Sequence, residues 1–387
     1  MTMPDSNSNH PDKLKVLIAT ALPPPDHGGI ASWARNLRGQ LSKDPDIELT
    51  FVDTTVHYRS PVNSFLGLRL VGGLIQGLRD TCRIYKKIKA NRPNLLHLTT
   101  SGGLATVKDL IILTIARRLG VPSVIHYHMG RFPGIIERAG IEWKLTRRTM
   151  RMADVVIPLD KTSESDIKAA LPGLKVVKLP NMVEIDVIDQ IRRQGPPSPP
   201  CPEGCARLVY AGHVIPKKGL RELVSACVQI SSYPIVLDIV GPFAAGFKKQ
   251  LMEIASRAGR GKWLNFLGWM ERSEAIRHIA HADIFVLPSY TEGMPNVVLE
   301  AMACERAILS TTVGAMPEML DIGGPGECGV CVPPRNADAL ADAIRDLLQN
   351  PQLRGQLGRK ARQRALQLYS VPVGCEQLLN LWRSLGK

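Results

Sequence analysis

The sequence predicts an α/β protein with two doubly wound units in tandem, each a parallel sheet covered by helices. Three observations lead to this fold class. Short β-branched runs alternate with amphipathic stretches, and such alternation favours a parallel sheet. A proline-rich segment interrupts the alternation once, and the same pattern then restarts. The length of 387 residues suits two domains, since domains usually hold about 100–200 residues.

The first unit opens with a predicted strand at 15–19 and a helix at 30–41, and further strands are expected at 95–98, 123–126 and 154–157. Each strand run is short and mostly apolar, as expected of strands that are buried on both faces of a sheet.

The clearest linker is the stretch 194–202, which holds five prolines in nine residues. This density of proline excludes a helix or an inner strand. We therefore predict an N-terminal domain over 1–193, a linker over 194–206 and a C-terminal domain over 207–371. A helix at about 372–387 is expected to pack back on the N-terminal domain.

The second unit repeats the alternation. Strands are expected at 207–210, 235–240, 263–267, 284–287 and 307–310, and helices at 218–230, 247–258, 272–280, 296–304, 337–349 and 353–368. Two such units enclose a cleft, and folds of this type bind their ligands there.

The charge is strongly positive and uneven. The net charge is +14, with 28 Lys and Arg against 18 Asp and Glu in residues 1–195, and 21 against 17 in residues 196–387. A basic half suggests an anionic partner, which is a nucleic acid, an acidic lipid surface or a phosphorylated substrate. Only 5% of residues are aromatic and no nucleic-acid-binding motif is present, so we expect no nucleic acid.

The N-terminal stretch 1–12 is polar and lacks the basic-then-apolar order of a secretory signal. With no apolar run of the ~18 residues that span a bilayer, we expect a cytoplasmic protein with a short disordered leader. Two local cysteine pairs, Cys201 with Cys205 and Cys328 with Cys331, have no histidine at ligand spacing. We therefore favour free thiols over a zinc site.

The most informative segment is 288–300, Pro-Ser-Tyr-Thr-Glu-Gly-Met-Pro-Asn-Val-Val-Leu-Glu, which runs from a strand through a turn into a helix. We expect Asn296 or a neighbour to cap this helix, and the free N–H groups of 296–298 to favour an anion. Glu292 and Glu300 would repel phosphates, so we expect them to bind the hydroxyls that flank the diphosphate of a nucleotide-sugar. The alternative is a loop charge and an exposed helix residue.

A second segment, 210–220, reads Tyr-Ala-Gly-His-Val-Ile-Pro-Lys-Lys-Gly-Leu and also leads from a strand into a helix. Gly212 allows a ligand to approach the backbone, and Lys218 supplies a full positive charge for a diphosphate. The alternative is that Lys217 and Lys218 form a solvated basic step before the helix.

Together these segments resemble the C-terminal half of glycosyltransferase family four, a large retaining family with the GT-B fold of two tandem Rossmann-like domains and an interdomain cleft. Its Gly-Arg-x4-Lys-Gly turn matches 212–219, and its Glu-x7-Glu loop-helix matches 292–300. Similar segments are 179–181, the strand at Ile308 with 314–318, and 329–334.

The resemblance implies that Lys218 binds the donor diphosphate, Glu292 contacts the transferred sugar and Glu300 holds the ribose hydroxyls. The pocket residues that it implies are Gly293, Met294, Asn296, Val297 and Val298. The family's usual arginine is replaced by His213, a weaker and pH-dependent phosphate ligand, and Lys217 is a second cation at this turn.

The N-terminal half resembles the family at two places. Gly28 and Gly29 match the glycine-rich loop after the first strand, which approaches the diphosphate, although a simple turn is the alternative. His126-Tyr-His128 resembles the strand-end segment in which a histidine meets the donor sugar. We favour His128 for that role and place His126 in the strand; the alternative for both is a structural histidine.

Two stretches, 65–89 and 142–151, combine apolar residues with Lys and Arg and suit an acidic membrane surface. The resemblance implies that acceptors, which are often lipid-linked sugars, bind the N-terminal domain. The alternative is ordinary core helices with a solvated basic face.

The sequence therefore predicts a retaining glycosyltransferase that moves a sugar from a UDP-, GDP- or ADP-sugar to a glycan or lipid-linked acceptor, in bacterial polysaccharide or glycolipid synthesis. Glu292, His128 and Lys218 are the predicted catalytic residues, with no metal or other cofactor. A dehydrogenase is disfavoured because no G-x-G-x-x-G follows the first strand. A sugar-nucleotide epimerase or hydrolase and a non-catalytic nucleotide-binding protein stay open as alternatives.

Overall fold

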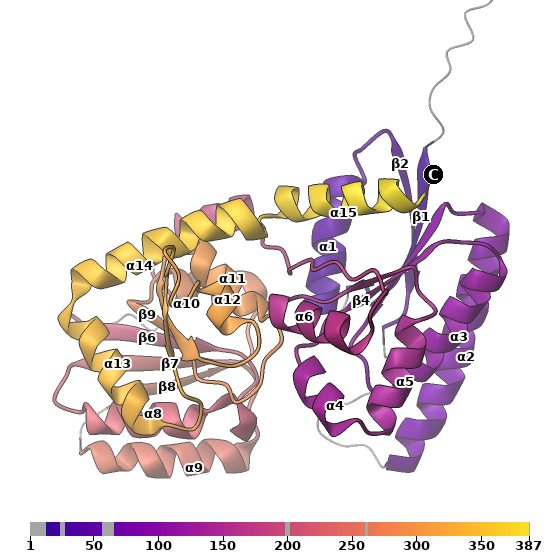
Figure 1. Ribbon diagram of the computed structural model, residues 1–387. Coiled ribbons are helices and arrows are strands. Elements are labelled where there is room, and N and C mark those ends of the chain that lie inside the picture. The colour runs from indigo at the N-terminus through magenta and orange to yellow at the C-terminus, as the bar shows by residue number, and fades with distance from the viewer. Residues whose placement is uncertain (1–12, 24–27, 56–65, 198–201, 260–261, 387) are drawn as a thin grey trace, which may run out of the picture.

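The computed structural model describes residues 13–23, 28–55, 66–197, 202–259 and 262–386. Two α/β domains lie side by side, each with a parallel sheet between helices (Figure 1). The predicted fold class is confirmed. The predicted leader at 1–12 lies outside the described residues.

The first sheet has the strand order β2-β1-β3-β4-β5, and its four pairings are parallel. Its strands are β1 (Leu14–Thr20), β2 (Ile47–Asp53), β3 (Leu95–Thr100), β4 (Ser123–Tyr127) and β5 (Val155–Ile157). Its helices are α1 (Gly29–Leu41), α2 (Leu66–Asn91), α3 (Ala105–Arg118), α4 (Phe132–Arg138), α5 (Ile141–Met150) and α6 (Lys161–Ala170). The edge strand β2 was not predicted, because polar residues interrupt its apolar ones and most of the strand is only partly buried.

The second sheet has the order β11-β10-β9-β6-β7-β8. Its strands are β6 (Ala206–Ala211), β7 (Ile235–Val240), β8 (Leu264–Gly268), β9 (Ile284–Leu287), β10 (Ala307–Thr311) and β11 (Val330–Val332). Its helical elements are α7 (Ile185–Arg192), η1 (Pro216–Lys218), α8 (Leu220–Gln229), α9 (Ala245–Ala255), η2 (Ser256–Ala258), α10 (Arg272–Ala280), α11 (Asn296–Ala303), α12 (Met316–Met319), α13 (Ala337–Gln349), α14 (Pro351–Arg364) and η3 (Ala365–Tyr369). The helices predicted at 272–280 and 337–349 are confirmed residue for residue.

The chain enters the second domain earlier than the proline-rich segment suggests. Ile185, Ile188 and Ile191 on α7 are buried in the apolar core of the second domain, where α7 packs against α10 and α11. The crossing therefore precedes α7, whereas the predicted boundary at 193 follows it. Prolines mark an irregular connection between α7 and β6, but the spacing of three residues between the isoleucines decides which core the helix joins.

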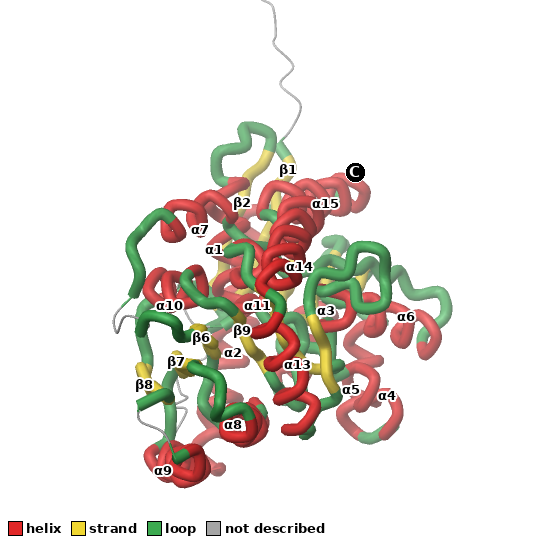
Figure 2. Tube along the Cα trace, turned by 90° about the vertical axis from the view of Figure 1, so that its left-hand side faces the viewer, coloured by secondary structure: helices red, strands yellow, loops and turns green. Residues whose placement is uncertain are grey.

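The last helix, α15 (Val371–Leu385), returns to the first domain and runs above α1 (Figures 1 and 2). Cys375, Leu378 and Trp382 lie in the same apolar cluster as Leu37 of α1. This is the packing expected for the helix at about 372–387. Of the helices in the described part of the chain, none combines the length and apolarity needed to cross a membrane.

Candidate active site

The site is built at the point where the strand order of the second sheet reverses, between β6 and β9. Because these strands are parallel neighbours, the turns that follow them lie together at one edge of the sheet. The Tyr290 N–H donates to the Lys217 carbonyl at 2.9 Å. Gly219 has a φ of +70°, and a Cβ there would lie 2.8 Å from the Pro288 carbonyl carbon, so only glycine lets the turns pack this closely.

Lys218 and Glu292 meet between these two turns. Lys218 Nζ lies 2.5 Å from Glu292 Oε1, and Ser289 Oγ donates to the same oxygen at 2.6 Å. Lys218 ends the short helix η1, and α8 begins only at Leu220, so the helix predicted from 218 starts two residues later. The structure thus brings together two of the three predicted catalytic side chains and holds each in place with the opposite charge of the other.

The loop that carries Glu292 touches the first domain through two glycines. A Cβ on Gly130 would lie 2.6 Å from the Glu292 carbonyl oxygen, and one on Gly293 would lie 2.9 Å from the Gly130 nitrogen. On its other side, the Gly293 carbonyl accepts a bond of 2.9 Å from the Ala315 N–H. The two domains therefore meet backbone to backbone next to the predicted sugar-binding carboxylate.

His128 lies directly after β4, and its N–H donates to the Thr100 carbonyl at 2.8 Å. Its ring centroid is 4.2 Å from that of His126 and 5.7 Å from that of Trp33. Both ring nitrogens are buried, and the Asn181 side chain is a hydrogen-bonding neighbour of the ring. Burial lowers the pKa of His128 to about 3, so the ring is neutral near pH 7 and can exchange hydrogen bonds with a ligand without adding charge.

Asn181 links the two domains at the same place, and the sequence alone gave it no role. Its Nδ2 donates to the Met294 carbonyl at 2.8 Å. The same nitrogen would lie 3.8 Å from a Cβ placed on Gly29. Asn181 Oδ1 is buried, and the Asn181 side chain is a hydrogen-bonding neighbour of His128. The similarity of the segment 179–181 to the family is the signal that could have identified this residue.

The start of α11 differs from the prediction. The N-cap is Pro295, the neighbour of Asn296, and no side chain caps the helix. The Val298 N–H donates to the Pro295 carbonyl at 3.1 Å, and the Val298 side chain is fully buried in the core. The first turn therefore uses the N–H of Val298 internally. Asn296 and Val297 therefore keep the N–H groups available to an anion.

Glu300 projects from α11 toward α10 and is not an exposed helix residue. Its Oε1 accepts a bond of 2.7 Å from Arg272 Nε, and its side chain is 12% exposed. Within the described residues, Glu300 pairs with Arg272, whereas Lys218 pairs with Glu292, so the two carboxylates stand in separate ion pairs.

The remaining predicted residues lie at turns between strand and helix. Gly28 has a φ of +111° and precedes α1; the adjoining residues 24–27 are outside the described chain. The backbone carbonyl of His213 accepts a bond of 2.8 Å from the Tyr210 hydroxyl. Gly212, with a φ of +152°, directly follows β6.

The described residues contain no group of three or more His, Cys, Asp or Glu side chains that could hold a metal ion. Cys328 and Cys331 are free thiols. Burial raises the pKa of Cys328 to about 11 and that of Cys331 to about 12, which disfavours the thiolate form that binds metals.

Comparison with known proteins gives a consistent result. Residues 194–364 match the model of the family described as glycosyl transferases group 1. Alpha-D-kanosaminyltransferase from Streptomyces kanamyceticus is 24% identical over 334 residues, which cover 81% of this chain and 82% of that protein. Sulfoquinovosyl transferase SQD2 from Arabidopsis thaliana is 24% identical over 298 residues, or 73% of this chain and 55% of that protein.

Two solved structures share the fold over nearly the whole chain. Sucrose-phosphate synthase from Thermosynechococcus elongatus has a TM-score of 0.75 at 19% identity, covering 96% of this chain and 99% of that one. HepE from Anabaena, solved in complex with UDP, has a TM-score of 0.72 at 17% identity, covering 96% of this chain and 100% of that one. The predicted GT-B architecture is therefore confirmed.

Proposed function

We propose that this chain transfers a sugar from a nucleoside diphosphate to an acceptor hydroxyl with retention of configuration. The match of residues 194–364 to the model of glycosyl transferases group 1, and the similarity to alpha-D-kanosaminyltransferase, support this proposal. The observation that carries the proposal is the contact between Lys218 and Glu292 beside the junction of the two domains. That HepE binds UDP and UDP-glucose supports a UDP-sugar as the first donor to test.

In the proposed reaction the bond between C1 of the sugar and the diphosphate oxygen breaks, and the acceptor oxygen forms the new bond to C1. Lys218 and the N–H groups of Asn296 and Val297 stabilise the charge that develops on the departing diphosphate. The acceptor proton passes to the departing phosphate oxygen. No metal is needed in this scheme, because an ammonium group and backbone donors oppose the diphosphate charge.

Glu292 and His128 have complementary roles in this proposal. Glu292, held by Lys218 and Ser289, accepts hydrogen bonds from the sugar hydroxyls and stabilises positive charge near C1. His128 supplies a neutral hydrogen-bonding group from the first domain. Glu300 accepts bonds from the ribose hydroxyls at the far side of the diphosphate.

The decisive experiment compares the purified wild type with Glu292→Ala and Lys218→Ala. A thermal-shift panel of UDP-, GDP- and ADP-sugars identifies the donor, and turnover of that donor is then followed with and without lipid-linked acceptors. We expect each variant to lose about 100-fold or more in kcat, as is typical for removal of a group that stabilises the transition state. Unchanged turnover in Glu292→Ala would exclude the proposed site.

We further propose that the acceptor is lipid-linked and that the enzyme meets it at an acidic membrane surface. The helix α2 buries the polar Gln76 and Asp80 while Leu74 and Leu78 are 66% and 65% exposed. Burying polar side chains while exposing apolar ones is unfavourable for a helix whose outer face meets only water. It supports the membrane alternative for the stretch 65–89, of which Phe65 and the side chains of 66–71 lie outside the described structure.

The neighbouring helices extend the same surface. On the flank of the first domain α2 packs beside α3, and α3 packs beside α5 (Figure 1). Leu104 before α3 is 72% exposed and Ile141 on α5 is 84% exposed. Lys144, Arg147 and Arg148 on α5 are exposed as well, and cations beside apolar side chains favour an anionic bilayer.

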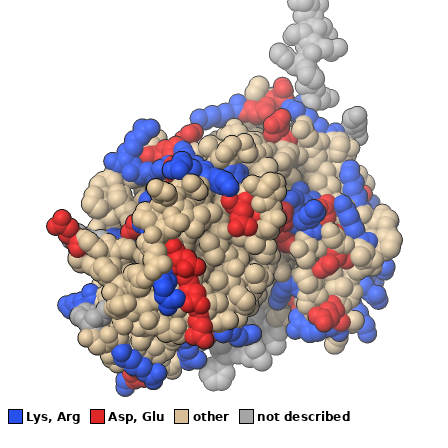
Figure 3. All heavy atoms as spheres, turned by 60° about the vertical axis from the view of Figure 1, so that its left-hand side comes forward, with Lys and Arg blue, Asp and Glu red and all other residues tan. Residues whose placement is uncertain are grey.

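The apolar flank is connected to the carboxyl edge of the first sheet. The helices α2 and α3 follow β2 and β3, so their first turns lie at the carboxyl edge of the sheet, the edge that carries His128. On the face shown in Figure 3, Lys and Arg lie in several separate groups among Asp and Glu. This pattern gives no support to a broad nucleic-acid surface there.

Flotation with liposomes tests the membrane proposal. Wild type should float with vesicles that contain acidic lipid, and the double variant Leu74→Asp with Leu78→Asp should float much less. Met252→Asp is the matched control, since Met252 is an exposed apolar residue of α9 in the other domain. Equal flotation of all three proteins, or none at low salt, would remove the membrane proposal.

A further inference from the structure

Arg272, the first residue of α10, lies between two carboxylates from different parts of the molecule. Its Nε donates to Glu300 Oε1 at 2.7 Å, and its Nη1 donates to Glu184 Oε2 at 3.0 Å. The three side chains are mostly buried, with 25%, 12% and 25% exposure for Arg272, Glu300 and Glu184. One planar guanidinium therefore satisfies two partly desolvated charges at once, which the single ammonium of a lysine does less well.

Glu184 extends this set of charges to the first domain. It precedes α7 at the place where the chain enters the second domain, and its Oε2 also lies 3.5 Å from Arg35 Nη2 on α1. An ion chain of Arg35, Glu184, Arg272 and Glu300 therefore connects α1 with α11. Because α1 follows β1 and α11 follows β9, both helices begin at the carboxyl edge of their sheet.

The geometry at Glu300 is suited to a diol. Arg272 engages Oε1, which fixes the carboxylate while the second oxygen keeps its acceptor positions. A glutamate without such a partner would sample several rotamers. Fixing one rotamer on binding would cost conformational entropy and so reduce the binding free energy gained from each hydrogen bond to the ligand. Arg272 removes much of that cost before the ligand arrives.

We propose that Arg272 is a positioning residue for the donor. It orients Glu300 toward the ribose. Through Glu184 and Arg35, it also couples nucleotide binding to the packing of α1 against the second domain. The inference rests on the proposed function, because it takes Glu300 as the ribose ligand. It adds a residue that lies outside the two segments that identify the donor site.

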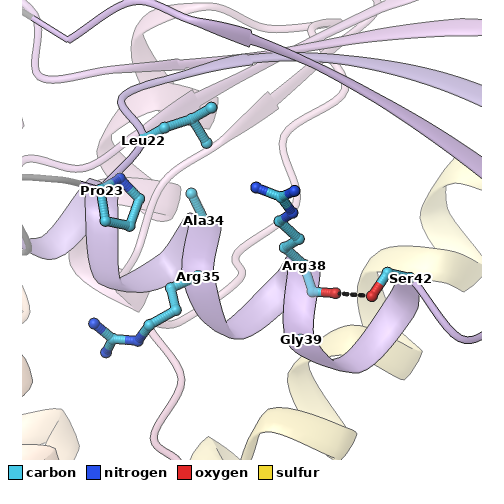
Figure 4. Close-up of a pocket in the computed structure, with 7 residues that line it drawn as sticks. All are labelled: Leu22, Pro23, Ala34, Arg35, Arg38, Gly39 and Ser42. Carbon is cyan, nitrogen blue, oxygen red and sulfur yellow. Dashed lines mark hydrogen bonds between the residues drawn. The ribbon is translucent and has the colours of Figure 1, made fainter.

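Arg38 provides a matched control for the charge on α1. Arg35 and Arg38 both line a cavity of about 370 Å³ beside α1, but their side chains point in different directions (Figure 4). The guanidinium of Arg38 lies 5.9 Å from the centre of the Phe51 ring, whereas that of Arg35 lies beside Glu184. Arg38→Gln therefore removes a cation from the same helix and leaves the chain intact.

The test uses ribose hydroxyls as the readout. Among UDP, GDP and ADP, the nucleotide with the largest thermal shift on the wild type is selected. Its dissociation constant, and those of its 2′-deoxy and 3′-deoxy forms, are measured by calorimetry for wild type, Arg272→Gln, Arg272→Lys and Arg38→Gln. Circular dichroism and thermal midpoints establish that each variant is folded, and Arg272→Lys serves if the glutamine variant is not.

We expect the wild type to bind at least one deoxy form about 10-fold more weakly than the ribonucleotide, the size of one hydrogen bond to a charged group. In Arg272→Gln the ribonucleotide should bind about 10-fold more weakly and the preference for ribose should fall to about 2-fold or less. Arg272→Lys should be intermediate, and Arg38→Gln should match the wild type.

A double-mutant cycle tests the coupling to α1. Arg35→Gln should weaken nucleotide binding about 2-fold to 3-fold, and combining it with Arg272→Gln should add no further loss, because the chain is already broken. Additive losses would overturn the coupling. Undiminished ribose preference in Arg272→Gln, or none in the wild type, would overturn the positioning role while nucleotide binding persists. A wild type that binds none of the nucleotides would overturn the proposed function as well.

Discussion

The two sides of the cleft use different chemistry, although both are carboxyl edges of parallel sheets. On the second-domain side charges are paired, Lys218 with Glu292 and Arg272 with Glu300. On the first-domain side the strands bring together three buried imidazoles that pack around Trp33. These are His97, His126 and His128, and burial lowers the pKa of each.

This difference shows that the sheet fixes where a ligand lies, while the side chains at its edge decide which charges meet it. Paired ions keep a cation ready for a diphosphate and orient the carboxylates. Neutral histidines add hydrogen-bonding capacity without competing for the anion. The donor charge is therefore expected to be handled almost wholly by the second domain.

The largest expected effect comes from separating the two sides. In Gly130→Ala the new methyl group would lie 2.6 Å from the Glu292 carbonyl oxygen, which forces the domains apart. Displacement of the reacting groups by about 1 Å should lower kcat/KM for the donor by about 100-fold. Steady-state kinetics measure this.

Gly134→Ala is the control for that substitution, since no heavy atom lies within 4 Å of the Cβ that it would add. It should keep wild-type kinetics. Wild-type kinetics in Gly130→Ala as well would mean that the backbone contact is not part of the reacting arrangement.

The stability of the first domain, which holds the neutral histidines, should fall in acid. His97 and His128 have a pKa of about 3 in the folded protein and about 6.5 when unfolded, so the unfolded state binds more protons between these values. Their stabilising contribution is present at pH 7 and is lost as the pH falls from about 6.5 toward 3. At pH 5 the loss is about 2 kcal/mol per histidine.

Urea unfolding at pH 7 and pH 5 measures this loss. A His97→Gln variant should be less stable at pH 7, because Trp382 Nε1 donates to His97 Nδ1 at 3.1 Å, but its stability should depend less on pH. Equal pH dependence in variant and wild type would show that His97 does not contribute to the acid sensitivity.

The smallest expected effect concerns the bridge between the two sides. Asn181→Ala removes the bond from Nδ2 to the Met294 carbonyl and should lower donor turnover by about 10-fold, the size of one buried hydrogen bond. Asn181→Asp should not restore turnover, because an ionised carboxylate cannot donate.

Asn36→Ala is the matched control, since it removes a similar buried amide bond, of 3.1 Å, to the Met182 carbonyl instead of the Met294 carbonyl. It should reduce stability and leave kcat unchanged. A loss of stability alone in Asn181→Ala would reduce Asn181 to a structural link between the domains.

Much of the fold was predictable because local pattern encodes it. Strands such as 284–287 are short apolar runs between polar turns, and helices such as 272–280 have apolar residues at helical spacing. The position of α7 was not predictable, because proline content marks a loop but does not indicate which core the preceding helix joins. The edge strand β2 was missed because an edge strand needs no continuous apolar run.

The candidate site was likewise predictable only in part. The spacing of Lys218, Glu292 and Glu300 pointed to a nucleotide-sugar site, since each residue follows a strand and a turn. That Lys218 and Glu292 would pair with each other, 74 positions apart in the chain, depends on β6 and β9 being neighbours. Arg272 and Asn181 carry no local signal that assigns them a partner.

By itself, the sequence determined the alternation of strand and helix, the glycines that permit tight turns and the residue types at the strand ends. The tertiary structure alone decided which of those residues meet, which N–H groups of α11 remain available and which apolar side chains are exposed on α2. The reason is physical: backbone conformation follows mainly from neighbouring residues, whereas ion pairing and burial depend on segments that only the completed sheets bring together.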